Sequence, residues 1–188
     1  MRLTVTGPQN TGKTTFVEDF LSAFPDYFSP KETYRDVIRN NSLKVNRETT
    51  EKSQKLIRDF LYKQICEDKN KNVIFDRCVL DNFIYSYYQY ELGKFSKKFI
   101  DESEKMMFDS LKHLDALIFI PTGVSVPLKE DYLRDTDVQF IDSINRLFIS
   151  TILEVARKSK IKIAVITGDR KSRIDQIKKF IKFYGNKK

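Results

Sequence analysis

The sequence has few of the residues from which disulfide scaffolds, metal centres and histidine-based catalytic sites are built. Its 188 residues include two cysteines, Cys66 and Cys78, and one histidine, His113. Two cysteines without a metal-type spacing argue against a disulfide framework or a zinc site and are typical of a reducing compartment. One histidine cannot supply a Ser-His-Asp triad or a cluster of metal-binding imidazoles, and we interpret His113 as structural.

Long apolar runs are also missing. No run approaches the roughly 20 residues that a membrane-spanning helix needs, and the first residues do not show the charged and then apolar pattern of a signal peptide. No internal repeat, low-complexity tract or linker rich in proline, glycine or serine divides the chain. We therefore expect a single cytoplasmic domain over residues 1–188 with no membrane partner. Its apolar share of 40% is enough for a sizeable core.

What the sequence does contain is an alternation of strand and helix patterns. Apolar runs indicate strands at residues 3–6, 27–29, 73–75, 116–120 and 161–166, and amphipathic periodicity indicates helices at 15–24, 32–39, 51–68, 80–92, 97–114, 138–158 and 173–183. This order predicts an α/β fold in which helices cover both faces of a parallel sheet of about five strands. Ligands of such sheets bind beyond the carboxyl ends of the strands.

The segment between the first strand and the first helix fits the phosphate-binding pattern G-x-x-x-x-G-K-[ST]. It reads Gly7-Pro8-Gln9-Asn10-Thr11-Gly12-Lys13-Thr14, and Thr15 follows. The glycines allow backbone N–H groups to surround a β-phosphate at the start of the helix. Lys13 can reach the β- and γ-oxygens, and Thr14 can give its hydroxyl to Mg²⁺. We expect ATP with Mg²⁺ to bind at residues 7–15, within the three-layer α/β/α sandwich of P-loop NTPases.

A second candidate site follows the buried strand at 73–75. Asp76 ends this strand, so its carboxylate is expected to face the phosphate loop and to hold Mg²⁺ directly or through water. Arg77 places a guanidinium where charge develops on a moving phosphoryl group. It stands where many ATPases carry a water-activating glutamate, and the D-x-x-G and N-K-x-D patterns of GTPases are absent. Transfer to a bound acceptor is therefore favoured over hydrolysis, although Asp76-Arg77 alone could be an ordinary strand end with a surface ion pair.

Three motifs together resemble the nucleoside and nucleotide kinase superfamily. They are G-x-x-x-x-G-K-T-T, E-x-x-R (Glu32-Thr33-Tyr34-Arg35) and D-R-x-x-x-D (Asp76-Arg77-Cys78-Val79-Leu80-Asp81). The pattern is similar to the deoxynucleoside kinase and thymidylate kinase group and nearest to nicotinamide riboside kinase-like domains. Asp-Arg-Cys departs from the Glu-Arg-Ser or Asp-Arg-Ser of deoxynucleoside kinases and from the Asp-Arg-Tyr of thymidylate kinases, so the identity of the acceptor stays open.

The resemblance implies roles for residues on the acceptor side. Glu32 would match the carboxylate that contacts the acceptor hydroxyl or acts as its base. Arg35 and Arg77 would match arginines near the acceptor and the transferred phosphoryl group. Gln54 would match a glutamine that reads a base or an amide of the substrate.

The resemblance also implies a mobile lid at about residues 122–137. Arg134 would close over the γ-phosphate, with a solvated loop charge as the alternative. Asp137 either completes an R-x-x-D pattern of the nicotinamide riboside kinase-like group or simply caps the following helix. Gly168-Asp169-Arg170 would lie where related kinases hold adenine through the backbone.

The sequence thus predicts an ATP- and Mg²⁺-dependent kinase that transfers the γ-phosphate to a small nucleoside- or nucleotide-like acceptor. Two alternatives remain, a regulatory P-loop ATP-binding or ATPase protein and a 5′-hydroxyl polynucleotide kinase. The net charge of +8 fits nucleic acid, but it equally suits a polyanionic small substrate. Because no clear nucleic-acid motif accompanies the charge, a small acceptor is favoured.

Overall fold

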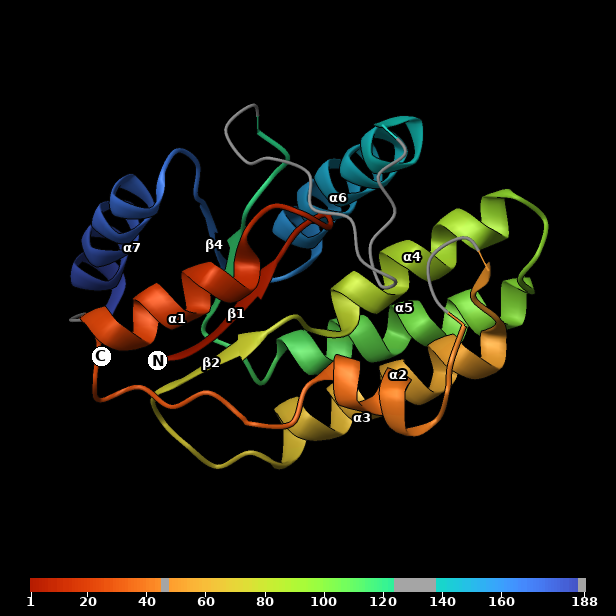
Figure 1. Cartoon of the computed structure of the whole chain (residues 1–188), viewed down its shortest axis with the longest axis horizontal. Coiled ribbons are helices and arrows are strands. Elements are labelled where there is room, and N and C mark those ends of the chain that lie inside the picture. Colours follow the sequence, from red (N-terminus) through yellow and green to blue (C-terminus); the bar gives the residue numbers. More distant parts are fainter. Residues whose placement is uncertain (45–47, 124–137, 186–188) are drawn as a thin grey trace.

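Four parallel strands form the central sheet of the protein (Figure 1). The computed structural model describes residues 1–44, 48–123 and 138–185. The strands are β1 (Arg2–Thr6), β2 (Val73–Asp76), β3 (Ala116–Phe119) and β4 (Lys162–Val165), and their order is β2-β1-β3-β4. The register pairs Val5 with Asp76 and Thr6 with Phe119. The end of β1 is therefore flanked by the ends of β2 and β3.

Helices cover both faces of this sheet. They are α1 (Lys13–Ala23), α2 (Tyr34–Asn40), α3 (Glu51–Glu67), α4 (Val79–Glu91), α5 (Lys97–Leu111), α6 (Val138–Lys158) and α7 (Arg170–Gly185). Helices α1 and α7 pack on one face, and α3, α4, α5 and α6 pack on the other, as Figure 1 shows. The expected α/β/α sandwich with a parallel sheet is confirmed.

Strand side chains alternate between the two layers, as the period of a strand requires. Leu3 and Val5 point toward α1, where they join a cluster with Phe20. Phe75 and Phe119 belong to the cluster on the opposite face. Each of these side chains is at most 4% exposed, and burial of such a side chain contributes about 1.5–3 kcal/mol. The two apolar layers fix the register of the strands and therefore the positions of the residues at their ends.

The expected strand at residues 27–29 is reduced to a single bridge. Phe28 N–H donates to the Asn72 carbonyl at 3.0 Å, and Ile74 N–H donates to the Phe28 carbonyl at 2.9 Å. The next donor toward β2 would be residue 30, and Pro30 has no N–H. The sheet therefore has four strands and this bridge, where about five strands were expected.

Helices α2 and α4 begin with the same type of cap. An aspartate at the third helical position accepts from the N–H of the residue before the helix. In α2, Thr33 N donates to Asp36 Oδ2 at 2.8 Å, and in α4, Cys78 N donates to Asp81 Oδ2 at 3.1 Å. Such a cap satisfies an N–H group that lacks a partner inside the helix. Helix α2 accordingly begins at Tyr34, two residues after the expected start at residue 32.

Two further expectations concern membrane-spanning helices and the lid. Within residues 1–44, 48–123 and 138–185, no helix is both long and apolar enough to cross a membrane. Most of the expected lid at about 122–137, with Arg134 and Asp137, lies outside the described residues.

Candidate active site

The phosphate-loop segment joins the end of β1 to the start of α1. Gly7 follows β1 with φ of 146°, and a Cβ atom there would lie 2.2 Å from the carbonyl oxygen of Ile120. Gly12 has φ of 77° and directly precedes Lys13, the first residue of α1. Both glycines of the pattern thus adopt conformations that L side chains rarely accept. The loop passes tightly beside the residue that follows β3 and ends at a helix N-terminus, which is the place where phosphates bind.

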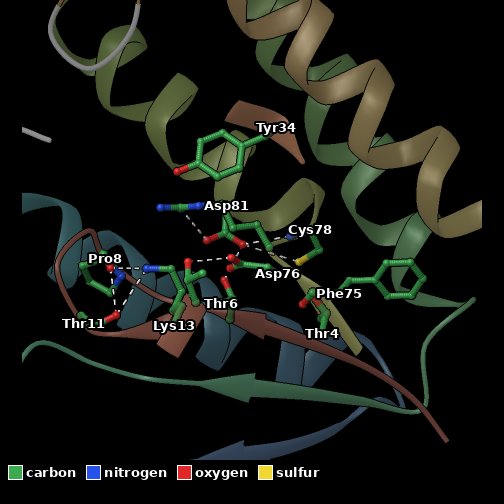
Figure 2. Close-up of polar contacts among 12 residues, drawn as sticks. Thr4, Thr6, Pro8, Thr11, Lys13, Tyr34, Phe75, Asp76, Cys78 and Asp81 are labelled. Atoms are coloured by element: carbon green, nitrogen blue, oxygen red, sulfur yellow. Dashed lines mark hydrogen bonds and ion pairs between the residues drawn. The ribbon is translucent and has the colours of Figure 1, made fainter. Parts of the chain in front are cut away.

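The Lys13 side chain lies folded over the loop. Lys13 is 5% exposed, and its ammonium donates to the Pro8 carbonyl and to the Thr11 hydroxyl, which is 3.3 Å from Nζ. Thr11 Oγ1 donates to the same carbonyl at 3.0 Å, and Figure 2 shows the three residues drawn together. These acceptors are neutral, so anionic phosphate oxygens would be stronger partners for the ammonium.

Thr14 and Asp76 meet where the end of β2 faces the first turn of α1. Thr14 Oγ1 donates to Asp76 Oδ2 at 2.8 Å. The other carboxylate oxygen, Asp76 Oδ1, is buried and has no hydrogen-bond partner among the described residues. A buried carboxylate oxygen is costly unless a donor or a cation compensates it. The hydroxyl and the carboxylate are hard oxygen ligands, and they fit a magnesium ion.

Arg77 forms the turn between β2 and α4. Its φ is 85°, in the left-handed region, and its N–H donates to the Val5 carbonyl at 2.9 Å. Nη1 donates to Asp81 Oδ1 at 3.1 Å, and Cζ lies 4.6 Å from the centre of the Tyr34 ring. Burial disfavours the charged guanidinium, but the neighbouring tyrosine and aspartate side chains, Tyr34 and Asp81 foremost, together outweigh burial, so the pKa of Arg77 lies above its ordinary value. A charged guanidinium is thus held beside Asp76.

Asp81 is the buried acceptor at the centre of this arrangement. Its side chain is 2% exposed. Oδ2 accepts from Thr6 Oγ1 at 2.8 Å and from Cys78 N at 3.1 Å, while Oδ1 accepts from Arg77. In Figure 2 Asp81 lies between the Tyr34 ring and Thr6. In the sequence, Asp81 is marked only as the last residue of D-R-x-x-x-D, and its spacing of four from Arg77 was the available signal of a contact.

Arg35 and Glu32, both expected on the acceptor side, are placed differently. Arg35 Nε donates to Tyr34 Oη at 3.3 Å, and Arg35 Cζ lies 5.9 Å from the centre of the same ring. Arg35 and Arg77 therefore share Tyr34. Glu32 is exposed, and its carbonyl accepts from Gln64 Nε2 at 2.8 Å. Within the described residues, the structure shows no hydrogen bond or ion pair of the Glu32 carboxylate.

Gln54 lies in a buried polar cluster between α3 and α4. Its Nε2 donates to Thr49 Oγ1 at 2.9 Å, and its Oε1 accepts from Asn82 Nδ2 at 2.5 Å. Asn82 also donates to the Gln54 carbonyl at 2.9 Å. Asn82 Oδ1 is buried without a hydrogen-bond partner in the part of the chain that the structure describes. Both polar atoms of the Gln54 amide are therefore hydrogen-bonded within the protein. The unpaired acceptor belongs to Asn82, which no sequence motif indicated.

One contact joins the phosphate loop to the distant α7. Arg173 is 8% exposed, and it donates from Nη1 to the Thr11 carbonyl at 2.7 Å and from Nε to the Gly168 carbonyl at 2.8 Å. Burial lowers the pKa of Arg173, and Asp169 partly opposes that shift. The expected adenine segment, which begins at Gly168, is thereby tied to the loop. No motif indicated Arg173, because a single arginine in a basic helix is usually a solvated charge.

The fold and the loop define an α/β protein of the P-loop class. The chain belongs to the AAA domain family AAA_28, which matches residues 2–173. No curated protein matches the chain in sequence.

Solved structures share the fold over nearly the whole chain. Deoxyadenosine kinase from M. mycoides with bound dATP has a TM-score of 0.72 at 17% identity and covers 97% of this chain and 99% of its own. NadR protein in complex with NR has a TM-score of 0.70 at 14% identity, with 99% of this chain and 51% of that chain covered. Thymidylate kinase from Candida albicans has a TM-score of 0.65 at 17% identity, with 98% and 92% covered. At these identities the likeness is one of fold, and it agrees with the expected P-loop α/β/α sandwich.

Proposed function

We propose that the protein is a kinase that uses ATP with Mg²⁺ to phosphorylate a small nucleoside- or nucleotide-like acceptor. The observation that carries this proposal is the surroundings of Asp76. Thr14 of the phosphate loop contacts Asp76 from one side, and the Arg77 guanidinium, the next residue along the chain, is held near it by Asp81. A loop that only binds ATP does not need an arginine beyond β2, whereas phosphoryl transfer does. Structures with the same fold include a deoxyadenosine kinase and a thymidylate kinase, which supports the proposal.

On the nucleotide side, the backbone N–H groups of residues 7–12 and the N-terminus of α1 would surround the β-phosphate. Gln9, Asn10 and Thr15 would contribute as parts of this loop. Lys13 would leave the Pro8 carbonyl and donate to the β- and γ-oxygens. Arg134, in the segment expected to form the lid, is the candidate for a further contact to the γ-phosphate.

The Thr14 hydroxyl and the Asp76 carboxylate would hold Mg²⁺, directly or through water. When bound, the ion neutralises charge on the phosphate oxygens. Over residues 1–44, 48–123 and 138–185, no group of three or more His, Cys, Asp or Glu side chains could hold a metal ion. A site with the single carboxylate of Asp76 nevertheless suits Mg²⁺, which usually takes one or two carboxylates and keeps water and phosphate oxygens as its other ligands.

On the acceptor side, the Arg77 and Arg35 guanidiniums would face the transferred group and neutralise its charge. Glu32 would orient the attacking hydroxyl and take its proton. Because Glu32 is exposed, the acceptor would have to bring its hydroxyl to this carboxylate. The buried pair Gln54 and Asn82 would read a polar ring of the acceptor through the unpaired Asn82 Oδ1.

A substrate screen tests the proposal. ADP release would be measured with nucleosides, nucleotides, nicotinamide riboside and a 5′-hydroxyl oligonucleotide as acceptors. We expect one class of small acceptor to stimulate ADP release and to be recovered as its phosphorylated product. ATP binding without transfer to any acceptor would indicate a regulatory switch. Phosphorylation of the oligonucleotide alone, with affinity that falls steeply as salt rises, would indicate a polynucleotide kinase.

Arg77→Ala and Glu32→Ala are each expected to lower transfer to the acceptor at least roughly tenfold, since a positioned acid–base group typically contributes about 100-fold or more. ATP affinity should change little, because neither side chain belongs to the phosphate loop. Turnover and calorimetric titration with a non-hydrolysable ATP analogue measure the two quantities. Arg39→Ala on α2 is the control, since this guanidinium is exposed. A parallel collapse of ATP affinity would place the residues in the nucleotide site or the fold instead.

Gly7→Ala is expected to weaken binding of the ATP analogue at least tenfold and to cost about 1–3 kcal/mol of stability, as overpacking does. The added Cβ would lie 2.2 Å from the Ile120 carbonyl oxygen, so the loop would have to move. Gly93→Ala is a matched control, because Gly93 also has a positive φ of 71° but nothing lies within 4 Å of its Cβ position. Equal losses of ATP affinity in the two variants would contradict the prediction; calorimetry and thermal unfolding provide the measurements.

A further inference from the structure

We propose that Asp81 is a positioning residue that holds the Arg77 guanidinium for phosphoryl transfer and fixes it relative to the phosphate loop. The inference rests on the proposed function and adds a residue to it. Asp81 is not expected to touch substrate, because its side chain is 2% exposed and both carboxylate oxygens are occupied.

The contacts of Asp81 exceed what a helix cap needs. A cap uses one acceptor oxygen, and Oδ2 supplies it to Cys78 N at 3.1 Å. Oδ1 accepts from Arg77 Nη1 at 3.1 Å. A buried carboxylate is costly unless it is paired with a charge and fully hydrogen-bonded. The Arg77 guanidinium is the charge that pairs with Asp81.

Thr6 connects this ion pair to the nucleotide side. Thr6 is fully buried, and its hydroxyl donates to Asp81 Oδ2 at 2.8 Å. The next residue is Gly7, the first residue of the phosphate loop. The same carboxylate therefore contacts the end of β1, which leads into the loop, and the arginine proposed to face the acceptor.

Tyr34 completes the positioning of Arg77 from another side. Its ring centre lies 4.6 Å from Arg77 Cζ, so the aromatic face covers the guanidinium. Nε and Nη2 of Arg77 make no hydrogen bond to any residue that the structure describes. Nη1 of the guanidinium is thus held by Asp81 and one face by Tyr34, and the remaining N–H groups would donate to substrate oxygens.

Asp36 offers a closely matched comparison on α2. It occupies the same capping position, where Oδ2 accepts from Thr33 N at 2.8 Å. Its other oxygen lies 3.6 Å from Arg39 Nη1, and the side chain is 33% exposed. Asp36 and Asp81 thus share the cap and a neighbouring arginine. They differ in burial, and only the arginine beside Asp81 belongs to the proposed site.

The test compares Asp81→Asn with Asp36→Asn. An asparagine can still accept from Thr6 and Cys78 through its carbonyl oxygen, but its amide group would then face Arg77 as a second donor. We expect Asp81→Asn to lower kcat at least roughly tenfold, less than the about 100-fold or more that a positioned catalytic group itself contributes. ATP affinity should stay within about twofold of the wild type. Asp36→Asn should leave both quantities unchanged. Equal kcat in Asp81→Asn and wild type would overturn the inference.

A double-mutant cycle with Arg77→Ala separates positioning from a purely structural role. Asp81→Asn should lower kcat little further when Arg77 is already absent. A loss as large in the Arg77→Ala background as in the wild type would mean that Asp81 acts through the fold, and the inference would fail while the proposed kinase stands. A wild type that transfers phosphate to no acceptor would instead overturn the proposed function and this inference together.

If Asp81→Asn does not fold, Thr6→Val carries the test. Valine has nearly the shape of threonine, and this substitution replaces the hydroxyl that orients the Asp81 carboxylate with a methyl group. We expect a several-fold loss of kcat, again with ATP affinity kept and with a much smaller effect in the Arg77→Ala background. Unchanged kcat in a folded Thr6→Val protein would overturn the inference.

Discussion

Lys13→Ala is expected to reduce phosphoryl transfer at least about 100-fold, because loss of a preorganised charge contact in the transition state costs about 3 kcal/mol or more. In the structure the ammonium is buried against the Pro8 carbonyl and the Thr11 hydroxyl, where it can reach incoming phosphate oxygens. Alanine leaves the backbone of α1 intact, so the fold should persist. Turnover in an ADP-release assay measures the loss, with thermal unfolding as the check on folding.

Lys171→Ala serves as the control for Lys13→Ala. Lys171 lies in α7 and is exposed, so its removal changes the net charge by the same amount without touching the loop. Turnover should stay within about twofold of the wild type, since surface substitutions away from the core and from functional sites have small effects. A Lys13→Ala protein with near-normal turnover would refute the assignment of residues 7–14 as the catalytic phosphate loop.

Asp76→Asn is expected to raise the Mg²⁺ concentration needed for half-maximal turnover at least roughly tenfold, or to abolish activity. The amide keeps the volume and can still accept from Thr14, but it cannot balance the charge of the cation. Titration of turnover against Mg²⁺ at fixed ATP measures the change. Asp142→Asn, in an exposed pair with Arg146 on α6, is the control. An unchanged magnesium curve for Asp76→Asn would mean that Asp76 only ends a strand.

The features that depend on local sequence could be predicted without the structure. The spacing Gly7–Thr14 identified the loop because its glycines meet a backbone requirement and its last two residues a side-chain requirement. The structure shows Gly7 and Gly12 at positive φ. The alternation of apolar strands and amphipathic helices predicted the sandwich because burial on both faces demands that pattern. The placement of Asp76 opposite Thr14 followed from two parallel strands that end at the same edge.

Features that depend on contacts between distant segments could not be predicted in this way. The strand at 27–29 fails because Pro30 cannot donate to the ladder, a constraint that matters only once the partner strand is known. Gln54 is engaged by Asn82, and the loop carbonyl of Thr11 is held by Arg173, 162 residues away. No local sequence pattern marks the side chains that make such contacts, since any polar residue at the right point of the fold could form the hydrogen bond.

The backbone conformation of Arg77 is expected to lower the stability of the protein. A non-glycine residue at φ of 85° stores on the order of 1–3 kcal/mol, and structures retain such strain where it is part of a mechanism. Glycine would relax the turn but has no guanidinium to offer, and asparagine, which also tolerates this conformation, would face Asp81 without a positive charge. If Arg77 acts in phosphoryl transfer as proposed, selection for thermostability alone would tend to remove the arginine, whereas selection for turnover would retain it. Arg77 is therefore the position where we expect a trade-off between stability and turnover.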